Sequence, residues 1–382
     1  MKKYERLLLF LLVLGITSCA TQAPISETDP GKSGEKAGIQ PDYVTIVAVG
    51  DNLYHSVMIH NGEEGDYDTA YSEIRPLIEK ADIAFINQET LLAGKDYGFS
   101  GYPLFNTPQK LGHAITRTGF NIVNHATNHI MDKGEKAVFA TMDFWDTIPE
   151  VTVLGIHRSK DQRSMPKLLR KNGITLGFLA YTYGTNGIRV PADKPYLVSL
   201  IQTEVMEKEI DSLRPLCDFL VVSMHWGEEY QHGYNKSQET LAAFLAEHNV
   251  DLVIGHHPHV TQTIETIERP DGKTMLCFYS LGNFLSGQIP NPTLLGAMAY
   301  IKITKDNKGS YSIYDYGALP LVTHYENDFT NFRVYPLYAY TEELAEKHRQ
   351  NQLKRGLSIA YSNNLAAKIF ADKEIRFDPF MR

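Results

Sequence analysis

The segment VIGHHPH, residues 253–259, places three histidines directly after an apolar run. Other apolar runs of the chain also lead to residues that can bind a metal ion or move a proton. These residues are Asp51, Glu89, Asn128, His129, His225, His256, His257 and His259. One such residue alone most often caps a turn or a helix. The recurrence on separate runs predicts one site, in which carboxylate, amide and imidazole groups bind Zn, Mn or Fe.

The elements that must position these residues are short β-rich runs that alternate with segments of helical period. We expect strands at 43–50, 82–87, 120–126, 151–155, 174–182, 218–226, 251–255 and 275–284. We expect helices at 69–81, 108–119, 135–145, 203–215 and 237–249. This alternation predicts an α/β fold with helices covering the sheets. Open α/β sheets bind ligands at the carboxyl ends of their strands, where these polar residues would meet.

The C-terminal part has a different pattern. Segments 296–305 and 309–320 have no helix between them and predict an antiparallel portion, whereas 341–370 is expected to be helical. We assign residues 42–325 to one domain and 326–382 to a mostly helical extension that packs on it. Cys217 and Cys277 lie beside apolar runs and are expected to be buried free thiols.

Six segments combine these apolar runs with polar residues: VAVGDNLYH (47–55), INQE (86–89), GFNIVNHATNHIMDKG (119–134), DFLVVSMHWGEEYQ (218–231), DLVIGHHPHVTQTIE (251–265) and FYSLGNFL (278–285). In order and approximate spacing they resemble the signatures of the poly-γ-glutamate capsule-synthesis CapA family. That family is related to calcineurin-like metallophosphatases. The resemblance therefore implies a four-layer α-β-β-α sandwich, with two packed sheets, helices outside and metals at one sheet edge.

The resemblance also implies roles for individual residues. The implied metal ligands are Asp51, Glu89, Asn128, His225, His257 and His259. His129 corresponds to the histidine of the family's Asn-His pair and is implied as an acid or base. Asp132 is expected either to orient His129 or to cap the next helix. His256, Asn283 and His55 are left as alternative ligands or supporting residues.

One position departs from the metallophosphatase pattern. A histidine normally stands two residues after the first aspartate, but this chain has Leu53 there, and His55 has a different spacing. The sequence therefore leaves open whether one or two ions bind. The loops 94–103 and 182–196 contain glycines and aromatic residues, and we expect them to select the substrate.

Two smaller groups of residues remain open to two interpretations. Trp226, Glu228, Glu229 and Tyr230 follow a proposed ligand. They could line a pocket, or Trp226 could belong to the core with the acids in solvent. His125 is expected to serve packing or to support the site.

The N-terminal residues indicate sorting rather than fold. Lys2, Lys3 and Arg6 precede the apolar run 7–14, and small residues then lead to Cys19. This pattern resembles the lipobox of bacterial lipoproteins, which implies a signal peptide at residues 1–18 and acylation of Cys19. An ordinary secretory signal or a single membrane span are the alternatives. Residues 19–41 have the composition of a flexible tether. We therefore expect an exported protein that is lipid-anchored in the bacterial cell envelope.

Charge and site together leave two functions. The net charge of −8, without a basic block, argues against nucleic acid as a partner. The first function is a metal-dependent hydrolase or transferase that acts on a phosphoester or an amide bond of an anionic cell-surface polymer. The second is a non-catalytic anchoring or assembly factor in a capsule synthesis or export complex.

Overall fold

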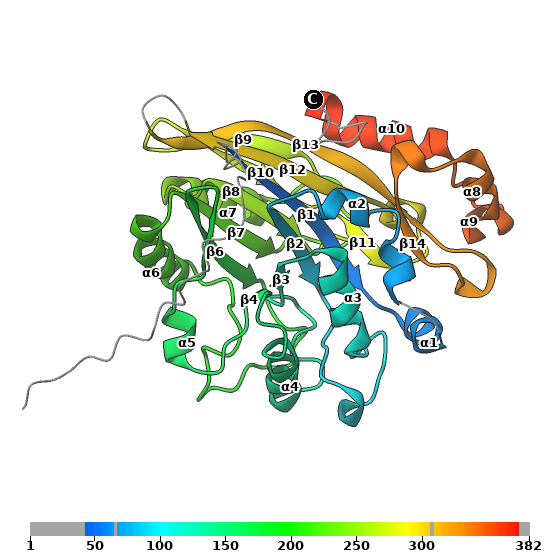
Figure 1. Cartoon of the computed structure of the whole chain (residues 1–382), viewed down its shortest axis with the longest axis horizontal. Helices are drawn as coiled ribbons and strands as arrows, with labels where there is room; N and C mark the ends of the chain where they lie inside the picture. The colour runs from blue at the N-terminus through cyan, green and yellow to red at the C-terminus, as the bar shows by residue number, and fades with distance from the viewer. Residues whose placement is uncertain (1–42, 65–66, 306–308, 374–382) are drawn as a thin grey trace, which may run out of the picture. The chain divides into compact units, whose positions relative to one another are not determined.

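Two β-sheets form the centre of the structure, a computed structural model that describes residues 43–64, 67–305 and 309–373 (Figure 1). The first sheet has the order β14-β13-β12-β1-β2-β3-β4, and β11 pairs with β1. Its strands are β1 (Tyr43–Leu53), β2 (Ile83–Gln88), β3 (Ile122–Asn124), β4 (Thr152–Leu154), β11 (Asn283–Ser286), β12 (Leu295–Lys305), β13 (Tyr311–His324) and β14 (Arg333–Pro336). The proposed signal peptide, the tether and Cys19 lie outside the described residues.

The second sheet has the order β5-β6-β7-β8-β10-β9. Its strands are β5 (Leu168–Lys171), β6 (Ile174–Thr182), β7 (Phe219–His225), β8 (Leu252–His256), β9 (Ile264–Glu268) and β10 (Thr274–Phe278). The helices are α1 (Ser56–Glu64), α2 (Arg75–Ile78), α3 (Lys110–Thr118), α4 (Glu135–Trp145), α5 (Lys160–Ser164), α6 (Thr203–Leu213), α7 (Lys236–Glu247), α8 (Glu342–Lys347), α9 (Arg349–Gln352) and α10 (Ile359–Phe370).

Apolar side chains alternate between the two faces of each strand. Each sheet therefore packs against the other sheet on one face and against helices on the other, which gives four layers. Between the sheets, Phe85 of β2 belongs to the same buried cluster as Val221 of β7. The outer face of the first sheet is covered by α2 and α3, through residues such as Ile115. The outer face of the second sheet is covered by α6 and α7, through residues such as Ile210 and Leu245. The predicted α/β fold, a four-layer α-β-β-α sandwich, is confirmed.

Parallel pairing brings the carboxyl ends of the central strands to one edge. β1 and β2 are parallel, with Asp51 opposite Asn87, and β2 and β3 are parallel, with Asn87 opposite Asn124. In the second sheet β7 and β8 are also parallel, with His225 opposite His256. The polar residues that follow these strands are therefore placed together by strand register. The antiparallel pairing of β12 with β13 is also as predicted.

The expected single strand at 275–284 is wrong, because it is two strands that lie in different sheets. β10 belongs to the second sheet and β11 to the first. The chain crosses between them at Gly282, which has a φ of 64°. The Gly282 carbonyl accepts a hydrogen bond from the Asp51 amide at 2.9 Å. A Cβ atom on Gly50 would lie 1.9 Å from this oxygen, so the close approach requires glycine.

Two expected helices are interrupted. Segment 69–81 is a 3-10 turn (Tyr67–Tyr71) followed by α2, which begins near Pro76 because proline favours the first helical turn. Segment 341–370 contains α8, α9 and α10 as separate helices. Side chains of α10, including Phe370, join the apolar cluster that also contains residues of β12 and β13.

A pair of buried histidines lies at this C-terminal end. Nδ1 of His324 is 2.8 Å from the Tyr340 hydroxyl. His348 caps the start of α9, because its Nδ1 accepts a hydrogen bond from the Gln350 amide at 3.0 Å. Its Nε2 donates to the Thr323 carbonyl at 3.3 Å. The two rings are 5.4 Å apart.

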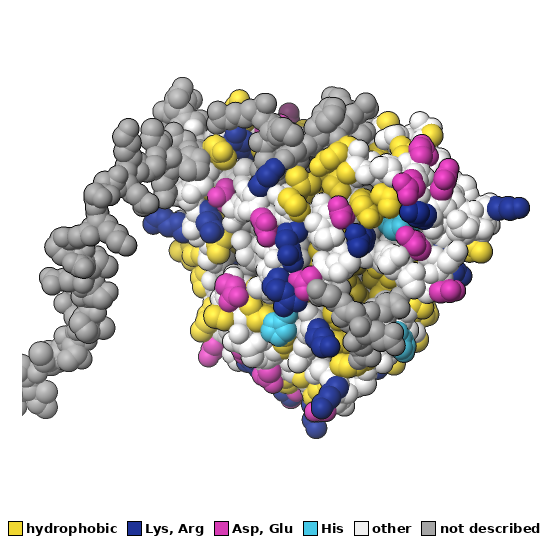
Figure 2. Space-filling view, turned by 45° about the vertical axis from the view of Figure 1, so that its right-hand side comes forward, with side chains coloured by type: hydrophobic (Ala, Val, Ile, Leu, Met, Phe, Trp, Pro, Cys, Tyr) yellow, Lys and Arg dark blue, Asp and Glu magenta, His cyan; other side chains and the backbone are white. Residues whose placement is uncertain are grey.

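Figure 2 shows acidic and basic side chains interspersed on one face of the molecule. Cys277 is a buried free thiol as predicted, whereas Cys217 is free but only partly buried. Within the described ranges, no helix has the length and apolar character needed to cross a membrane.

Candidate metal centre

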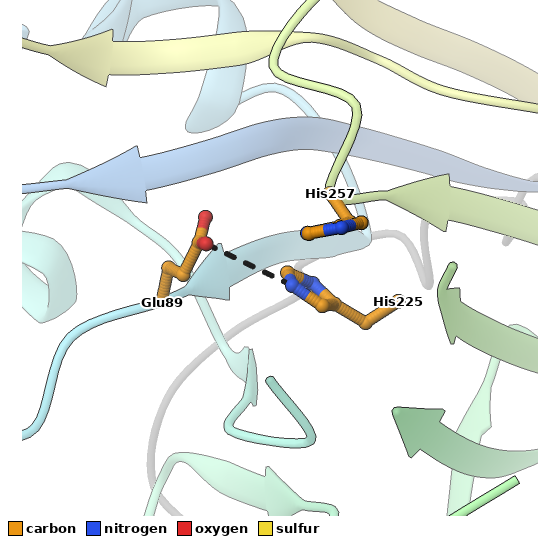
Figure 3. A group of neighbouring side chains, drawn as sticks. All are labelled: Glu89, His225 and His257. Carbon is orange, nitrogen blue, oxygen red and sulfur yellow. Dashed lines mark ion pairs between the residues drawn. The ribbon is translucent and has the colours of Figure 1, made fainter. Parts of the chain in front are cut away.

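Three side chains from both sheets converge at the carboxyl ends of the strands (Figure 3). Glu89 follows β2, His225 ends β7 and His257 follows β8. One ligand atom from each lies within 4.8 Å of the other two. His225 Nε2 is 3.7 Å from Glu89 Oε1, and the two imidazole rings are 4.9 Å apart. Two imidazoles and one carboxylate can hold a divalent transition metal.

A second set of ligand atoms shares Glu89 with the first. Asp51, Glu89 and His259 also offer atoms within 4.8 Å of one another, and His259 Nδ1 is 3.0 Å from Asp51 Oδ2. A carboxylate common to two ligand sets is suited to a pair of neighbouring ions. Glu229, which is exposed, forms a further set with His257 and His259.

The remaining predicted ligand lies beside the first set. Asn128 Oδ1 is 2.9 Å from His225 Nε2, so the amide oxygen is directed at the first set of ligand atoms. The proposed ligands are therefore brought together by the fold. Leu53 is buried, and His55 belongs to none of the ligand sets found among the described residues. Instead, His55 Nδ1 accepts a hydrogen bond from the Gly287 amide at 3.1 Å.

Electrostatics show that these residues fit a cation. Burial, followed by the nearby charge of Asp51, raises the pKa of Glu89 well above its usual value. Neither carboxylate oxygen of Glu89 has a hydrogen-bond partner among the described residues. A buried carboxylate without a donor is costly, and a divalent ion would compensate it. Burial also lowers the pKa of His257 to about 3, which favours the neutral form that binds metal.

His259 behaves differently from its neighbours. Burial opposes its charge, but the nearby charge of Glu89 and the hydrogen bond to Asp51 raise the pKa of His259 to about 9. Burial raises the pKa of Asp51, yet its hydrogen bond and charge interaction with His259 hold it below the ordinary value. The carboxylates of the centre therefore attract positive charge.

The backbone around the ligands is strained. His257 has a φ of 98° and His259 a φ of 58°, values that non-glycine residues rarely adopt. The His257 amide donates to Asp51 Oδ2 at 3.2 Å. Such strain persists only where surrounding contacts over-determine it, and it clusters at functional sites.

His129 and Asp132 form a separate pair at the rim. His129 Nδ1 is 2.8 Å from Asp132 Oδ2, which also accepts from the Phe105 amide at 2.7 Å. The residue that precedes α4 as its cap is Gly134, so the alternative interpretation of Asp132 as a helix cap is wrong. With Nδ1–H directed at Asp132, the other ring nitrogen of His129, Nε2, remains available for a substrate.

The other candidate residues occupy supporting positions. The His256 ring stacks on Phe85 with ring centres 5.6 Å apart, and it lies outside the ligand sets found within the described residues. Asn283 Oδ1 is 3.1 Å from His259 Nδ1. His125 accepts a hydrogen bond from Trp145 Nε1 at 2.8 Å, which is a packing role.

A cleft of about 460 Å³ opens beside the centre, and Tyr102, His129, Glu229 and Tyr230 are among the residues that line it. Glu228 is exposed. Trp226 is a core residue, because it is buried and its Nε1 donates to the Tyr279 carbonyl at 2.9 Å.

The sequence pattern did not single out several residues that contact the proposed ligands or His129, among them Asn87, Tyr183 and Phe105. Asn87 donates to Asp51 Oδ1 at 2.8 Å, and its signal was an amide within the apolar run before Glu89. The Tyr183 ring lies 4.5 Å from that of His257, and the Phe105 ring 4.6 Å from that of His129. Tyr183 belongs to loop 182–196, which was expected to face a substrate, whereas no signal distinguished Phe105.

The protein is a four-layer α-β-β-α sandwich in which polar residues of both sheets gather at the carboxyl ends of the strands, the place where α/β sheets bind ligands. Residues 45–288 match the family described as "Bacterial capsule synthesis protein PGA_cap", and the chain belongs to this family. The family resemblance drawn from the sequence is confirmed.

Individual relatives are distant in sequence. The chain is 25% identical over 276 residues to "PGA biosynthesis protein CapA" of Bacillus subtilis (strain 168), covering 71% of each chain. It is 27% identical over 258 residues to "Capsule biosynthesis protein CapA" of Bacillus anthracis, covering 64% of this chain and 60% of that protein. The solved structure of NAD nucleotidase from Haemophilus influenzae aligns with a TM-score of 0.44 and 10% identity, over 85% of this chain and 66% of that one.

Proposed function

We propose that this protein is a metal-dependent hydrolase or transferase of the bacterial cell envelope that acts during capsule polymer synthesis. Its substrate would contain a phosphoester or a polymer amide bond. The observation that carries this proposal is the buried carboxylate of Glu89, which has no hydrogen-bond donor among the described residues and is shared by two sets of ligand atoms. A purely structural role for these histidines would not require a buried acid without a hydrogen-bond donor at their centre.

The residues have distinct tasks in this proposal. Asp51, Glu89, His225, His257 and His259, with the amide of Asn128, would hold one or two divalent ions. Such an ion, when bound, lowers the pKa of water to about 7 and polarises the oxygen of the bond under attack. In phosphoester hydrolysis, a hydroxide oxygen, formed when water gives its proton to the solvent, bonds to phosphorus while the bond from phosphorus to the leaving oxygen breaks. His129 would donate a proton to that leaving oxygen, and Asp132 would keep the imidazole oriented.

Metal content is the first test. We would purify the protein without a histidine tag or chelator and measure Zn, Mn and Fe by elemental analysis. The proposal predicts one or two equivalents of metal, and a reduction of about tenfold or more in His225→Ala. His113→Ala is the matched control, because His113 is exposed on α3 and outside the ligand sets.

Turnover decides between the enzyme and the assembly factor. We would assay the metal-loaded protein with bis(p-nitrophenyl) phosphate and with a γ-glutamyl p-nitroanilide. Hydrolysis of either that is lost in His225→Ala supports the proposal. Absence of metal after reconstitution would refute it and favour a non-catalytic anchoring or assembly role.

Anchoring is a separate part of the proposal. We propose that acylation of Cys19 holds the protein at the membrane of the cell envelope, since residues 1–19 resemble a lipoprotein signal. Cys19→Ser is then expected to move the protein from the membrane fraction to the soluble fraction. Unchanged membrane association of the variant would contradict this anchor.

A further inference from the structure

The cleft beside the metal centre has a distinctive lining. It is reached from both sheets: Tyr102 lies on the loop after β2, and Tyr230 on the loop after β7. His129 and His259 also line it, so a molecule in the cleft would contact the reacting groups. The side chains of the cleft therefore determine which chemical group of a substrate can lie next to the bond that is broken.

Apart from its histidines, the described part of the lining offers a polyanion no positively charged side chain. Among the described residues that line the cleft, none is a lysine or an arginine. The lining has one carboxylate among the described residues, that of Glu229. This carboxylate would repel further carboxylates on a substrate. The same carboxylate, with the side-chain amide of Gln288, can accept hydrogen bonds from hydroxyl groups.

Aromatic rings supply the rest of the recognition surface. Tyr102 is 77% exposed and Tyr230 is 50% exposed. Tyr102 packs edge-on against Phe105, with centroids 6.4 Å apart, and Phe105 packs against His129. Exposed aromatic rings beside a few polar groups are typical of small-molecule sites, because each ring offers an apolar face with a polar tip.

Tyr230 is held in an unusual conformation. Its φ is 65°, which is an outlier for a bulky residue. Its amide donates to the Pro258 carbonyl at 2.8 Å, within the loop that carries His257 and His259. Its hydroxyl accepts from Gln288 Nε2 at 3.4 Å, and Gln288 in turn accepts from Asn283 at 2.9 Å. These contacts fix the ring relative to the proposed ligands.

We propose that this cleft is a subsite for an uncharged sugar ring that carries the reacting phosphoester, with Tyr102 and Tyr230 as the residues that set the preference. The C–H face of the sugar packs on the tyrosine rings, and its hydroxyls donate to Glu229 and Gln288. This inference rests on the proposed function and narrows its substrate class. It favours a sugar phosphate over a polymer of glutamate, whose carboxylates follow one another along the chain.

Two measurements test the subsite. Saturation-transfer NMR of methyl α-D-glucopyranoside with the Zn-loaded protein reports sugar binding without turnover. Kinetics with glucose 1-phosphate and glucuronic acid 1-phosphate report the effect of one added carboxylate on the same ring. The wild-type protein should bind the glucoside and should have the higher kcat/KM for glucose 1-phosphate. Tyr102→Ala and Tyr230→Ala should weaken the NMR signal and raise KM for glucose 1-phosphate about two- to tenfold each.

The control is Tyr314→Ala, because Tyr314 is 72% exposed on β13 and does not line the cleft. The inference is overturned if the wild-type protein gives no glucoside signal, if both cleft variants behave like the control, or if glucuronic acid 1-phosphate is preferred. Glucoside binding that depends on the tyrosines, without turnover of any phosphoester, would overturn the proposed reaction and leave the sugar site standing.

Discussion

Two groups of buried histidines in this protein differ in what surrounds them. At the C-terminal end, His348 uses both ring nitrogens, one toward the Gln350 amide and the other toward the Thr323 carbonyl. At the strand ends, Glu89 has no hydrogen-bond partner for either oxygen, and His257 has none for Nδ1, among the described residues. His348 is therefore satisfied, although its neighbour His324 has no hydrogen-bond partner for Nε2 among the described residues, whereas Glu89 and His257 are left incomplete.

The difference between His348 and His257 is the one expected between a structural histidine and a candidate ligand. Burial lowers the pKa in both groups, to about 3 for His348 and to about 3 for His257, so neutrality alone does not distinguish them. Buried polar groups are normally paired, and unpaired ones require an explanation. The three predictions that follow test this distinction.

Removing the central charge should have the largest effect. Glu89→Gln keeps the size of the side chain but loses the carboxylate shared by two ligand sets. We expect metal content to decrease by about tenfold or more and turnover to become undetectable. In chelator-treated protein the same change should raise the melting temperature near pH 7, because an unfavourable buried acid is removed.

Elemental analysis and thermal unfolding check this prediction. Glu228→Gln is the control, since Glu228 is exposed and belongs to none of the ligand sets of the described chain. Normal metal content in Glu89→Gln would show that the unpaired carboxylate does not mark a metal centre.

The rim pair should affect rate rather than metal. His129→Gln removes the proposed proton donor and should lower kcat about a hundred- to ten-thousand-fold with unchanged metal content. Asp132→Asn should lower kcat less, by about ten- to a hundredfold, because it disturbs only the orientation of His129. Measuring kcat and metal content on the same samples separates an effect on rate from an effect on metal binding. Full activity of His129→Gln would exclude His129 from the mechanism.

The C-terminal pair should affect only acid stability. Burial, followed by the charge of His324, lowers the pKa of His348 to about 3 from an ordinary value of 6.5. The unfolded chain therefore binds this proton at a higher pH than the folded chain does. Above about pH 6.5 the titration of His348 does not affect the free energy of unfolding, and as the pH falls from there toward 3 it lowers that free energy. The slope is about 1.4 kcal/mol per pH unit for each such histidine.

His348→Asn should reduce this slope, because asparagine can still cap α9 but does not titrate. Urea unfolding at pH 7, 6 and 5 measures it, and metal content should stay at the wild-type level. Loss of metal in His348→Asn would contradict the separation between the two groups.

The sequence predicted strand ends better than it predicted sheet membership. Residues that follow apolar runs, such as Asp51 and His225, could be assigned to one edge because parallel strands align their carboxyl ends. The run 275–284 is apolar on both sides of Gly282, so periodicity could not show that the chain changes sheets there.

Local backbone geometry also limited the prediction of the site. Spacing could not choose between His256 and His257 as a ligand. The choice depends on the positive φ of His257, which turns its side chain toward His225 while His256 stacks on Phe85. Phe105 was missed because its contact with His129 depends on how a long loop folds.

Because the proposed ligands come from both sheets, metal binding would be coupled to the stability of the fold. Asp51 and Glu89 belong to one sheet, and His225 and His257 follow strands of the other, so a bound ion would join the two halves of the sandwich. An ion that binds only the folded state stabilises it, by about 2.7 kcal/mol when its free concentration is a hundredfold above Kd. A cell short of the metal would then lose this protein to proteolysis faster, and its abundance would follow the metal content of the growth medium.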